Sequence, residues 1–199
     1  LSTELGNTDK INTLINECKE LKINVLTPNI ETSNKFFNVN EDLAIKYGLG
    51  AIKGVADSFI DHVLEVRKKQ SFKDLFDFTK KVNVRLGGKK SIEALTKAGA
   101  FDELAPSRSV ALACMEDMVR EGQKNSAQIA GTSDLFASME ETFDPYAKYV
   151  NVKELSQEDL LNHERDALGF YFSGPLDCGV DTFGPQLLPA PTPRSLAPR

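Results

Sequence analysis

The stretch that decides the fold is Tyr47-Gly48-Leu49-Gly50-Ala51-Ile52-Lys53-Gly54-Val55-Ala56, which runs directly into a helical pattern from Asp57 to Lys69. Its three glycines allow positive φ angles and let the backbone approach a ligand closely, because they carry no side chain. A glycine turn that leads into a helix presents free backbone N–H groups to an anion, and Lys53 adds a cation. From this stretch alone, an ordinary glycine-rich turn between core elements is an equal alternative.

Composition places the chain among ordinary globular proteins. It has 199 residues, of which 41% are hydrophobic and 27% are charged, and this suits one or two domains with a sizeable core. No apolar run approaches the length of a membrane span, and no charged-then-apolar leader is present. We therefore expect a cytoplasmic protein with no membrane partner. Because the chain does not begin with Met, we also expect it to be a piece of something longer.

The cysteines and histidines do not indicate a disulfide framework or a metal site. Cys18, Cys114 and Cys178 are odd in number and widely spaced, which suits reduced thiols. His62 and His163 lie far apart without ligand-like neighbours, so we expect a structural or surface role for each. No carboxylate cluster of the kind that holds catalytic metal ions is evident either. We expect no catalytic residue, no metal and no cofactor in this chain.

The charge is distributed unevenly along the chain. The formal net charge is −5, which taken alone argues against a nucleic-acid partner. Residues 43–124, however, carry 15 basic and 11 acidic side chains, a balance of +4, whereas the remainder has a balance of −9. This asymmetry marks the middle of the chain as a candidate surface for a polyanion, with a solvated face of mixed charge as the alternative.

The first part of the chain predicts a small unit of one helix and three strands. Thr8 is expected to cap a helix from Asp9 to about Leu21, whose apolar residues recur at helical spacing. A short strand is expected over residues 23–26. Residues 35–39 and 43–47 are apolar and β-branched enough to pair as strands across a polar turn. This unit directly precedes the glycine stretch.

The helix–glycine turn–helix pattern occurs a second time within about eighty residues. After the basic segment that contains Lys89 and Lys90, a short helix is expected over residues 91–97. A second turn, Gly99-Ala100-Phe101, then leads to a capped helix from about Ser107 to Gln123. Two such units packed as a pair form a tandem helix-hairpin-helix architecture. Its turns and helix N-termini contact DNA phosphates, which positions a protein on a duplex without reading its sequence.

The last part of the chain is more loosely patterned. A linker is expected from Asn125, and it is followed by Thr132-Ser133-Asp134-Leu135-Phe136, whose adjacent Leu and Phe are either a local hydrophobic contact or a linear motif for a partner's pocket. Ser156 is expected to cap a helix over residues 157–167, and residues 168–172 are expected to form a strand. The proline-rich tail from Cys178 is expected to be disordered.

An ordered series of short blocks resembles the alpha subunit of bacterial DNA polymerase III, the C-family replicative polymerase. The resemblance covers residues 1 to about 177, nearly everything except the tail. Each block is weak alone, and the order makes the series specific. The blocks are Asn7-Thr8-Asp9-Lys10, Glu17-Cys18, Val25-Leu26-Thr27-Pro28, Tyr47 to Val55, Leu75-Phe76-Asp77-Phe78, Ala98-Gly99-Ala100-Phe101-Asp102 and Leu168-Gly169-Phe170-Tyr171-Phe172-Ser173-Gly174.

The resemblance implies a fold that is mainly α with a small β component, divided into five parts. Residues 1–42 correspond to the end of the fingers region, and residues 43–125 to the tandem helix-hairpin-helix domain. Residues 126–155 correspond to a linker that carries the clamp-binding peptide, and residues 156–177 to a helix and strand that enter an oligonucleotide-binding fold. Residues 178–199 form a disordered or artefactual tail.

The resemblance and the turn pattern together give candidate binding residues. Residues expected at the duplex backbone are Gly50, Lys53, Gly54, Val55, Ala56, Lys89, Lys90, Gly99, Ala100 and Phe101. Residues expected at the sliding clamp are Thr132, Ser133, Asp134, Leu135 and Phe136. Three positions depart from the family pattern: Ala56 replaces a glycine, Thr132 replaces a glutamine, and Pro175 directly follows Gly174 where the family has His-Pro-Leu.

The resemblance implies a role in DNA replication. The parent subunit is a DNA-directed DNA polymerase, a nucleotidyltransferase whose palm aspartates hold Mg²⁺ ions, and these motifs are expected upstream of Leu1. This segment is therefore expected to be inactive alone, gripping duplex DNA and tethering the polymerase to the sliding clamp, the beta subunit. Other holoenzyme subunits are further expected partners. The alternative is a free-standing helix-hairpin-helix repair or recombination protein, including a nuclease.

Overall fold

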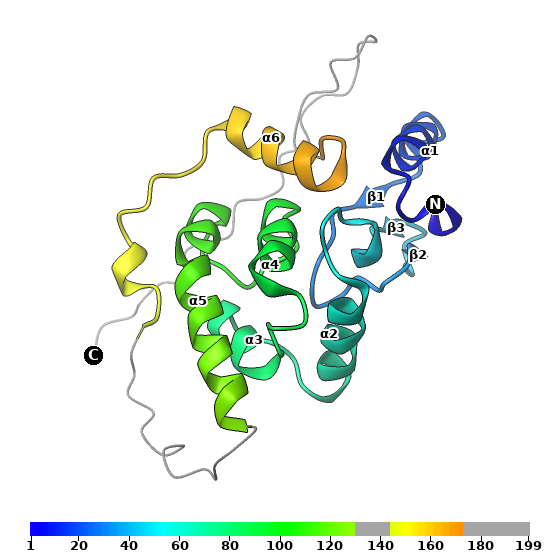
Figure 1. The fold of residues 1–199 in the computed structure, drawn as a ribbon. Coiled ribbons are helices and arrows are strands. Elements are labelled where there is room, and N and C mark those ends of the chain that lie inside the picture. The colour runs from blue at the N-terminus through cyan, green and yellow to red at the C-terminus, as the bar shows by residue number, and fades with distance from the viewer. Residues whose placement is uncertain (130–143, 173–199) are drawn as a thin grey trace, which may run out of the picture.

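The computed structural model describes residues 1–129 and 144–172, with no description of the side chains of residues 125–129. The fold is mainly α with one small sheet, as the sequence predicts (Figure 1). Three single-turn 3₁₀ helices accompany the main elements, namely Ser2–Glu4, Leu49–Ala51 and Ala147–Tyr149. The main elements are α1 (Thr8–Glu20), β1 (Val25–Leu26), β2 (Asn38–Val39), β3 (Ile45–Lys46), α2 (Asp57–Lys69), α3 (Leu75–Lys81), α4 (Gly88–Lys97), α5 (Arg108–Ile129) and α6 (Gln157–Leu168).

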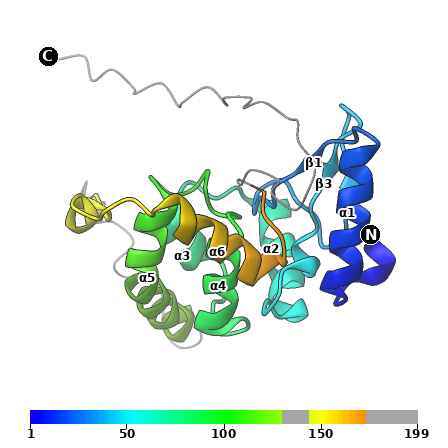
Figure 2. The same ribbon diagram turned by 90° about the horizontal axis from the view of Figure 1, so that it is seen from above.

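One continuous core runs through these elements. Helix α1 and the sheet lie at one end of the molecule, α3 and α5 lie at the other end, and α2 and α4 lie between them (Figures 1 and 2). Helix α6 packs on α4 although it comes much later in the sequence. The core contains Ile11 and Ile15 of α1 together with Ala167 and Leu168 of α6. The first and the last described helices therefore share one hydrophobic interior.

The sheet has the strand order β1-β3-β2, so β3 is the central strand. Val25 pairs with Ile45 in the parallel ladder, and Val39 pairs with the same residue in the antiparallel ladder. The expected pairing of residues 35–39 with 43–47 is therefore present, although each strand has only two residues. The turn between them is closed by Asn40, whose side chain accepts the Ala44 amide at 2.8 Å, and Leu43 within it adopts a left-handed conformation with φ +59°.

Three helix starts show how local side chains fix the element boundaries. The expected cap of α1 is wrong by one residue: Asn7, not Thr8, accepts the Lys10 amide at 3.2 Å, and Thr8 already lies within the helix. Asp74 caps α3 by accepting the Asp77 amide at 2.8 Å. Ser156 caps α6 as predicted.

Two predictions about the later part of the chain are wrong. Helix α5 continues past Gln123 to Ile129. Residues 168–172 form no strand: α6 runs to Leu168 and ends at Gly169, whose φ of +88° is a left-handed C-cap. The rings of Phe170 and Phe172 pack against Tyr47 at centroid distances of 5.8 and 5.9 Å. Aromatic packing onto the core, rather than strand pairing, explains the apolar pattern of this segment.

Candidate nucleic-acid interface

The first hairpin, residues 47–56, is tightly packed on the sheet side. A Cβ atom at Gly48 would lie 2.7 Å from the Phe36 carbonyl carbon, and one at Gly50 would lie 2.9 Å from the Lys35 carbonyl oxygen. Gly50 also donates its amide to that oxygen at 2.9 Å. These two glycines allow the hairpin to approach the chain before β2, so Gly50 serves internal packing here.

The outer part of the hairpin is held by α4. Gly54 has a φ of +85°, and the side chain of Lys90 lies 3.5 Å from the position that a Gly54 Cβ would take. Ser91 accepts the Ala56 amide at 3.2 Å and donates its hydroxyl to the Gly54 carbonyl at 3.4 Å. The structure therefore places the side chain of Lys90 beside Gly54, the residue that follows Lys53.

Four amides at this point make no hydrogen bond within the described residues. They belong to Gly54, Val55, Asp57 and Ser58, which surround the N-terminus of α2. Helix α2 has no side-chain cap that would occupy them. Partial positive charge at a helix N-terminus and unpaired N–H groups favour an oxyanion. The carboxylate of Asp57 is directed to Lys35, at 3.6 Å.

Lys53 has a second role in the fold. Its amide donates to the carbonyl of Ala167, at the end of α6, at 2.9 Å. Its Nζ lies 3.5 Å from the position that a Gly169 Cβ would take. The ammonium group therefore lies at the C-terminal end of α6, where the helix dipole favours a cation. The side chain is exposed and long enough to leave this place for a phosphate.

Lys89 is oriented differently from its neighbour Lys90. Its Nζ forms an ion pair with Glu116 of α5 at 2.5 Å, and both side chains are at least half exposed. This hydrogen bond lowers the pKa of Glu116. Exposed pairs of this kind contribute little stability, so Lys89 can exchange its partner at small cost.

The second hairpin, residues 99–101, makes mainly internal contacts. Gly99 has a φ of +81° and donates its amide to Thr96, and Ala100 donates its amide to Leu95. The side chains of Ala100 and Phe101 are each only 1% exposed, and Phe101 packs against Phe78 at 5.0 Å. These two side chains cannot face DNA as expected, because the aromatic core requires them. Any phosphate contact here has to use the backbone.

Arg108 binds two carboxylates, and this role was not predicted from the sequence. Its guanidinium makes two hydrogen bonds with Asp102, at 3.1 and 2.5 Å, and one with Glu164 of α6 at 3.3 Å. Burial alone would lower the pKa of Arg108, but the two carboxylates outweigh it and raise the pKa. The guanidinium fills the space beside Gly99, where a Cβ would lie 2.3 Å from Nη2. No local spacing rule links Arg108 to Glu164.

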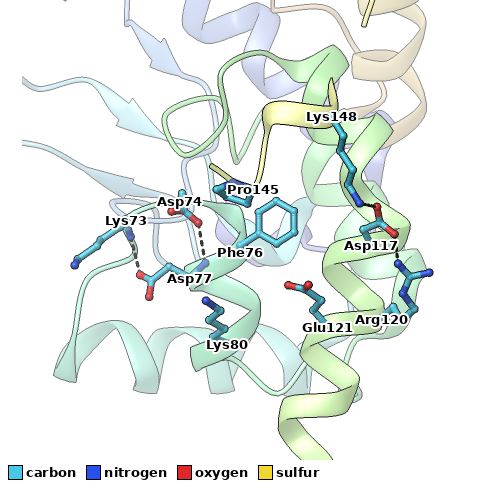
Figure 3. A pocket seen from close by; sticks show the side chains of 10 residues that line it. All are labelled: Lys73, Asp74, Phe76, Asp77, Lys80, Asp117, Arg120, Glu121, Pro145 and Lys148. Atoms are coloured by element: carbon cyan, nitrogen blue, oxygen red, sulfur yellow. Dashed lines mark hydrogen bonds and ion pairs between the residues drawn. The ribbon is translucent and has the colours of Figure 1, made fainter. Parts of the chain in front are cut away.

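A hollow of about 420 Å³ lies between α3, α5 and the segment before the last 3₁₀ turn (Figure 3). Phe76 and Pro145 form its apolar part, and charged side chains surround them. Asp117 accepts hydrogen bonds from Lys148, Tyr149 and Arg120, which hold its pKa at about 2. The remaining lining residues are Lys73, Asp74, Asp77, Lys80 and Glu121. Acidic and basic groups balance here, so the hollow is no polyanion site.

Several other predicted features can be compared only with the described ranges, 1–129 and 144–172. In these ranges no group of three His, Cys, Asp or Glu side chains is placed to hold a metal ion. No helix there is long and apolar enough to cross a membrane. Cys18 and Cys114 are free thiols, and burial raises the pKa of Cys114 to about 11. The peptide 132–136 and Cys178 lie outside the described residues.

Comparisons with known proteins agree with the fold and with the hairpin arrangement. Residues 22–111 match the family described as a helix-hairpin-helix motif. The chain is 36% identical over 196 residues to the DNA polymerase III subunit alpha of Pseudomonas fluorescens and 38% identical over 181 residues to that of Vibrio cholerae. Each match covers 89% of this chain, but 17% and 16% of the relative, respectively.

A third relative also matches most of this chain. The DNA polymerase III subunit alpha of Escherichia coli K12 is 30% identical over 177 residues, which cover 87% of this chain and 15% of the relative. The chain thus spans only about a sixth of the length of these curated relatives. By these matches, the chain is a homologue of one segment of the bacterial DNA polymerase III alpha subunits, and it contains a helix-hairpin-helix motif.

Proposed function

We propose that the chain binds the backbone of duplex DNA through the first hairpin, as one segment of a replicative DNA polymerase III alpha subunit. The observation that carries this proposal is the group of unpaired amides at Gly54, Val55, Asp57 and Ser58, flanked by Lys53 and Lys90. The helix-hairpin-helix match and the names of the relatives support it. Nucleotide transfer itself is proposed for other parts of the parent subunit, with Mg²⁺ bound there.

The geometry favours phosphate over base recognition. Amide groups at a helix N-terminus and two flexible lysines can bind a phosphate oxygen, but they present no side chain that could read base edges in a groove. The second hairpin contributes shape and rigidity, because the amides of Gly99 and Ala100 and the side chains of Ala100 and Phe101 are engaged internally. We therefore expect binding that is strongly salt-dependent and nearly independent of sequence.

Fluorescence anisotropy with labelled duplexes over a salt series tests this proposal. Lys53→Glu and Lys90→Glu should each weaken binding to all duplex sequences alike. Each should also reduce the slope of log K against log salt by about one, the value expected for one lost phosphate contact. Lys80→Glu is the matched control, since it makes the same charge change in the hollow between α3 and α5.

Two outcomes would contradict the proposal. An equal loss with Lys80→Glu would mean that only net charge matters, and a loss confined to some duplex sequences would mean that bases are read. Metal-dependent strand cleavage by the purified chain would instead favour the alternative of a repair nuclease.

We also propose that Thr132 to Phe136 bind a sliding clamp and connect the DNA-gripping surface to it. The support is the resemblance of this peptide to the family's internal clamp-binding peptide, with Asp134, Leu135 and Phe136 kept. Binding of the chain to a bacterial clamp, measured by biolayer interferometry, should be lost in the double variant Leu135→Ala/Phe136→Ala. A variant that restores Gln at position 132 should bind more tightly. Equal binding by the double variant would disprove this part.

A further inference from the structure

Helix α6 contacts both hairpins, although it follows both of them in the sequence. At its C-terminal end, the Ala167 carbonyl accepts the Lys53 amide of the first hairpin at 2.9 Å. One turn earlier, Glu164 accepts a hydrogen bond from Arg108, whose guanidinium lies against Gly99 of the second hairpin. Helix α6 packs on α4, the helix that leads into the second hairpin (Figures 1 and 2).

The contact with the second hairpin is almost completely shielded from water. The Glu164 side chain is 1% exposed and the Arg108 side chain is 9% exposed. The other carboxylate oxygen of Glu164 accepts the Phe172 amide at 2.7 Å, which fixes its orientation. A buried charge of this kind is costly when its partner is removed. This pair therefore holds the C-terminal half of α6 firmly against the second hairpin.

The contact with the first hairpin is also supported from behind. Asn12 of α1 donates its side-chain amide to the Gly169 carbonyl at 2.7 Å, and Ala167 and Leu168 are buried in the common core. The end of α6 is therefore fixed where the Lys53 amide meets it. The next residue, Gly54, begins the group of unpaired amides.

We propose that α6 is a strap that fixes the first hairpin relative to the second, and that Glu164 and Arg108 are positioning residues for duplex binding. This rests on the proposed function, because these residues would act on the same site without touching DNA. A phosphate gains most from amides that are already held in place, since little order then has to be created on binding. Loosening α6 at Glu164 should disorder the amides that follow Lys53, which meets the helix one turn further along, at Ala167.

The strap role of α6 and a simple charge effect predict opposite changes in DNA affinity for Glu164→Gln. Glu164→Gln removes a negative charge, so a long-range charge effect alone would tighten binding to DNA. The strap predicts weaker binding, because the Arg108 contact is reduced and the first hairpin is less well held. We expect about a fivefold weaker affinity near physiological salt, with the salt slope nearly unchanged, because the amides that lose order are neutral and release no counterions.

The binding experiment uses the full chain, a labelled duplex and two controls. Glu158→Gln makes the same charge change on the exposed face of α6, and it should leave affinity equal or slightly tighter. Met118→Ala removes a buried side chain of α5 and lowers stability without touching α6 contacts, so it should leave affinity unchanged. All variants are compared at a temperature where circular dichroism shows them folded. Binding by Glu164→Gln that equals the wild type would overturn the positioning role.

Amide hydrogen exchange tests the strap without DNA. The Lys53 amide, whose acceptor is on α6, should exchange faster in Glu164→Gln than in the wild type or in Glu158→Gln. Unchanged exchange at Lys53 would overturn the strap whether or not the chain binds DNA. If the wild type does not bind a duplex while Lys53 exchange responds to Glu164→Gln, the strap stands and the duplex-binding function fails.

Discussion

At the scale of single residues, the fold depends on side chains and glycines that bridge distant segments. Gly169 is the clearest case, because it ends α6 and faces α1 at the same point. Its φ is +88°, and a Cβ there would lie 2.1 Å from Cγ2 of Thr8. The sequence suggested a strand here, since the aromatic residues that follow resemble one. Nothing local reveals that α1 lies against this glycine.

Gly169→Ala should therefore destabilise the protein by about 3 kcal/mol, as the sum of left-handed strain and overpacking. The free energy of unfolding in urea measures this. Gly6→Ala is the matched control, since Gly6 has a φ of +93° but no atom within 4 Å of its Cβ position. It should cost only about 1 kcal/mol, from strain alone. Equal losses would show that the contact with Thr8 relaxes freely.

His163 predicts a pH dependence of stability. Burial, followed by the charge of Lys97, lowers its pKa below 6.5, and its Nδ1 is buried without a partner in the described part of the chain. Arg108 also disfavours the charged ring, while Asp159 and Asp166 favour it. The unfolded chain binds this proton more readily than the folded protein does. The stability contributed by the neutral His163 ring is therefore fully present above the unfolded pKa, and it is lost as the pH falls through the unfolded pKa toward the lower folded pKa.

The measurement compares urea unfolding of the wild type and His163→Gln between about pH 7.5 and pH 5.5, the range in which histidine titrates. The wild type should lose more stability than the variant as the pH falls. Since His62 is present in both proteins, the difference isolates His163. Parallel pH profiles would mean that the ring is protonated equally well in the folded protein.

At the scale of elements, the helices follow local chemistry that can be read from the sequence. The bounds of α2 agree with the predicted Asp57–Lys69, because its apolar spacing and the preceding hairpin define both ends. The cap of α1 was predicted one residue too late, because Asn7 rather than Thr8 accepts the Lys10 amide. The strands were predicted too long, because pairing geometry rather than propensity limits them to two residues each.

Asp74 should be important for α3, which has only seven residues. Asp74→Ala removes the acceptor for the Asp77 amide and should cost about 1 kcal/mol, measured as a lower melting temperature. Asp166→Ala removes an exposed carboxylate near the C-terminal end of α6, where the helix dipole disfavours it, and should change stability by less than about 0.5 kcal/mol. A loss with Asp166→Ala as large as that with Asp74→Ala would indicate a general charge effect.

At the scale of the whole molecule, the sequence indicated the tandem hairpins but not how they are held. Periodicity identified the core faces of separate helices, and the resemblance supplied their order. The position of α6 over both hairpins depends on pairs such as Arg108 with Glu164, which are too far apart in sequence for any local pattern. Likewise, the burial of Phe101 follows from an aromatic cluster assembled from three segments.

Phe78 is the centre of that aromatic cluster. Its ring contacts Phe72, Phe101 and Phe59 edge to face, at 5.0, 5.0 and 6.4 Å. Phe78→Ala should destabilise the protein by about 3–5 kcal/mol, because the cavity would be shared by α2, α3 and the second hairpin. Phe36→Ala, at a ring that is half exposed, should cost less than about 1 kcal/mol. Chemical denaturation measures both, and similar losses would contradict a single shared core.

The cluster around Asp117 has a mechanical consequence. Lys148 and Tyr149 attach the chain after residue 143 to α5, and α5 itself carries the chain up to Ile129. The described segments on either side of residues 130–143 are therefore attached to the same helix. A force that pulls these two segments apart would act on α5 at one of them and, at the other, on the Asp117 ion pair together with the Tyr146 hydroxyl, which accepts the Leu75 amide at 3.1 Å. High salt would weaken the ionic part of the second attachment, because Lys148 is exposed to solvent.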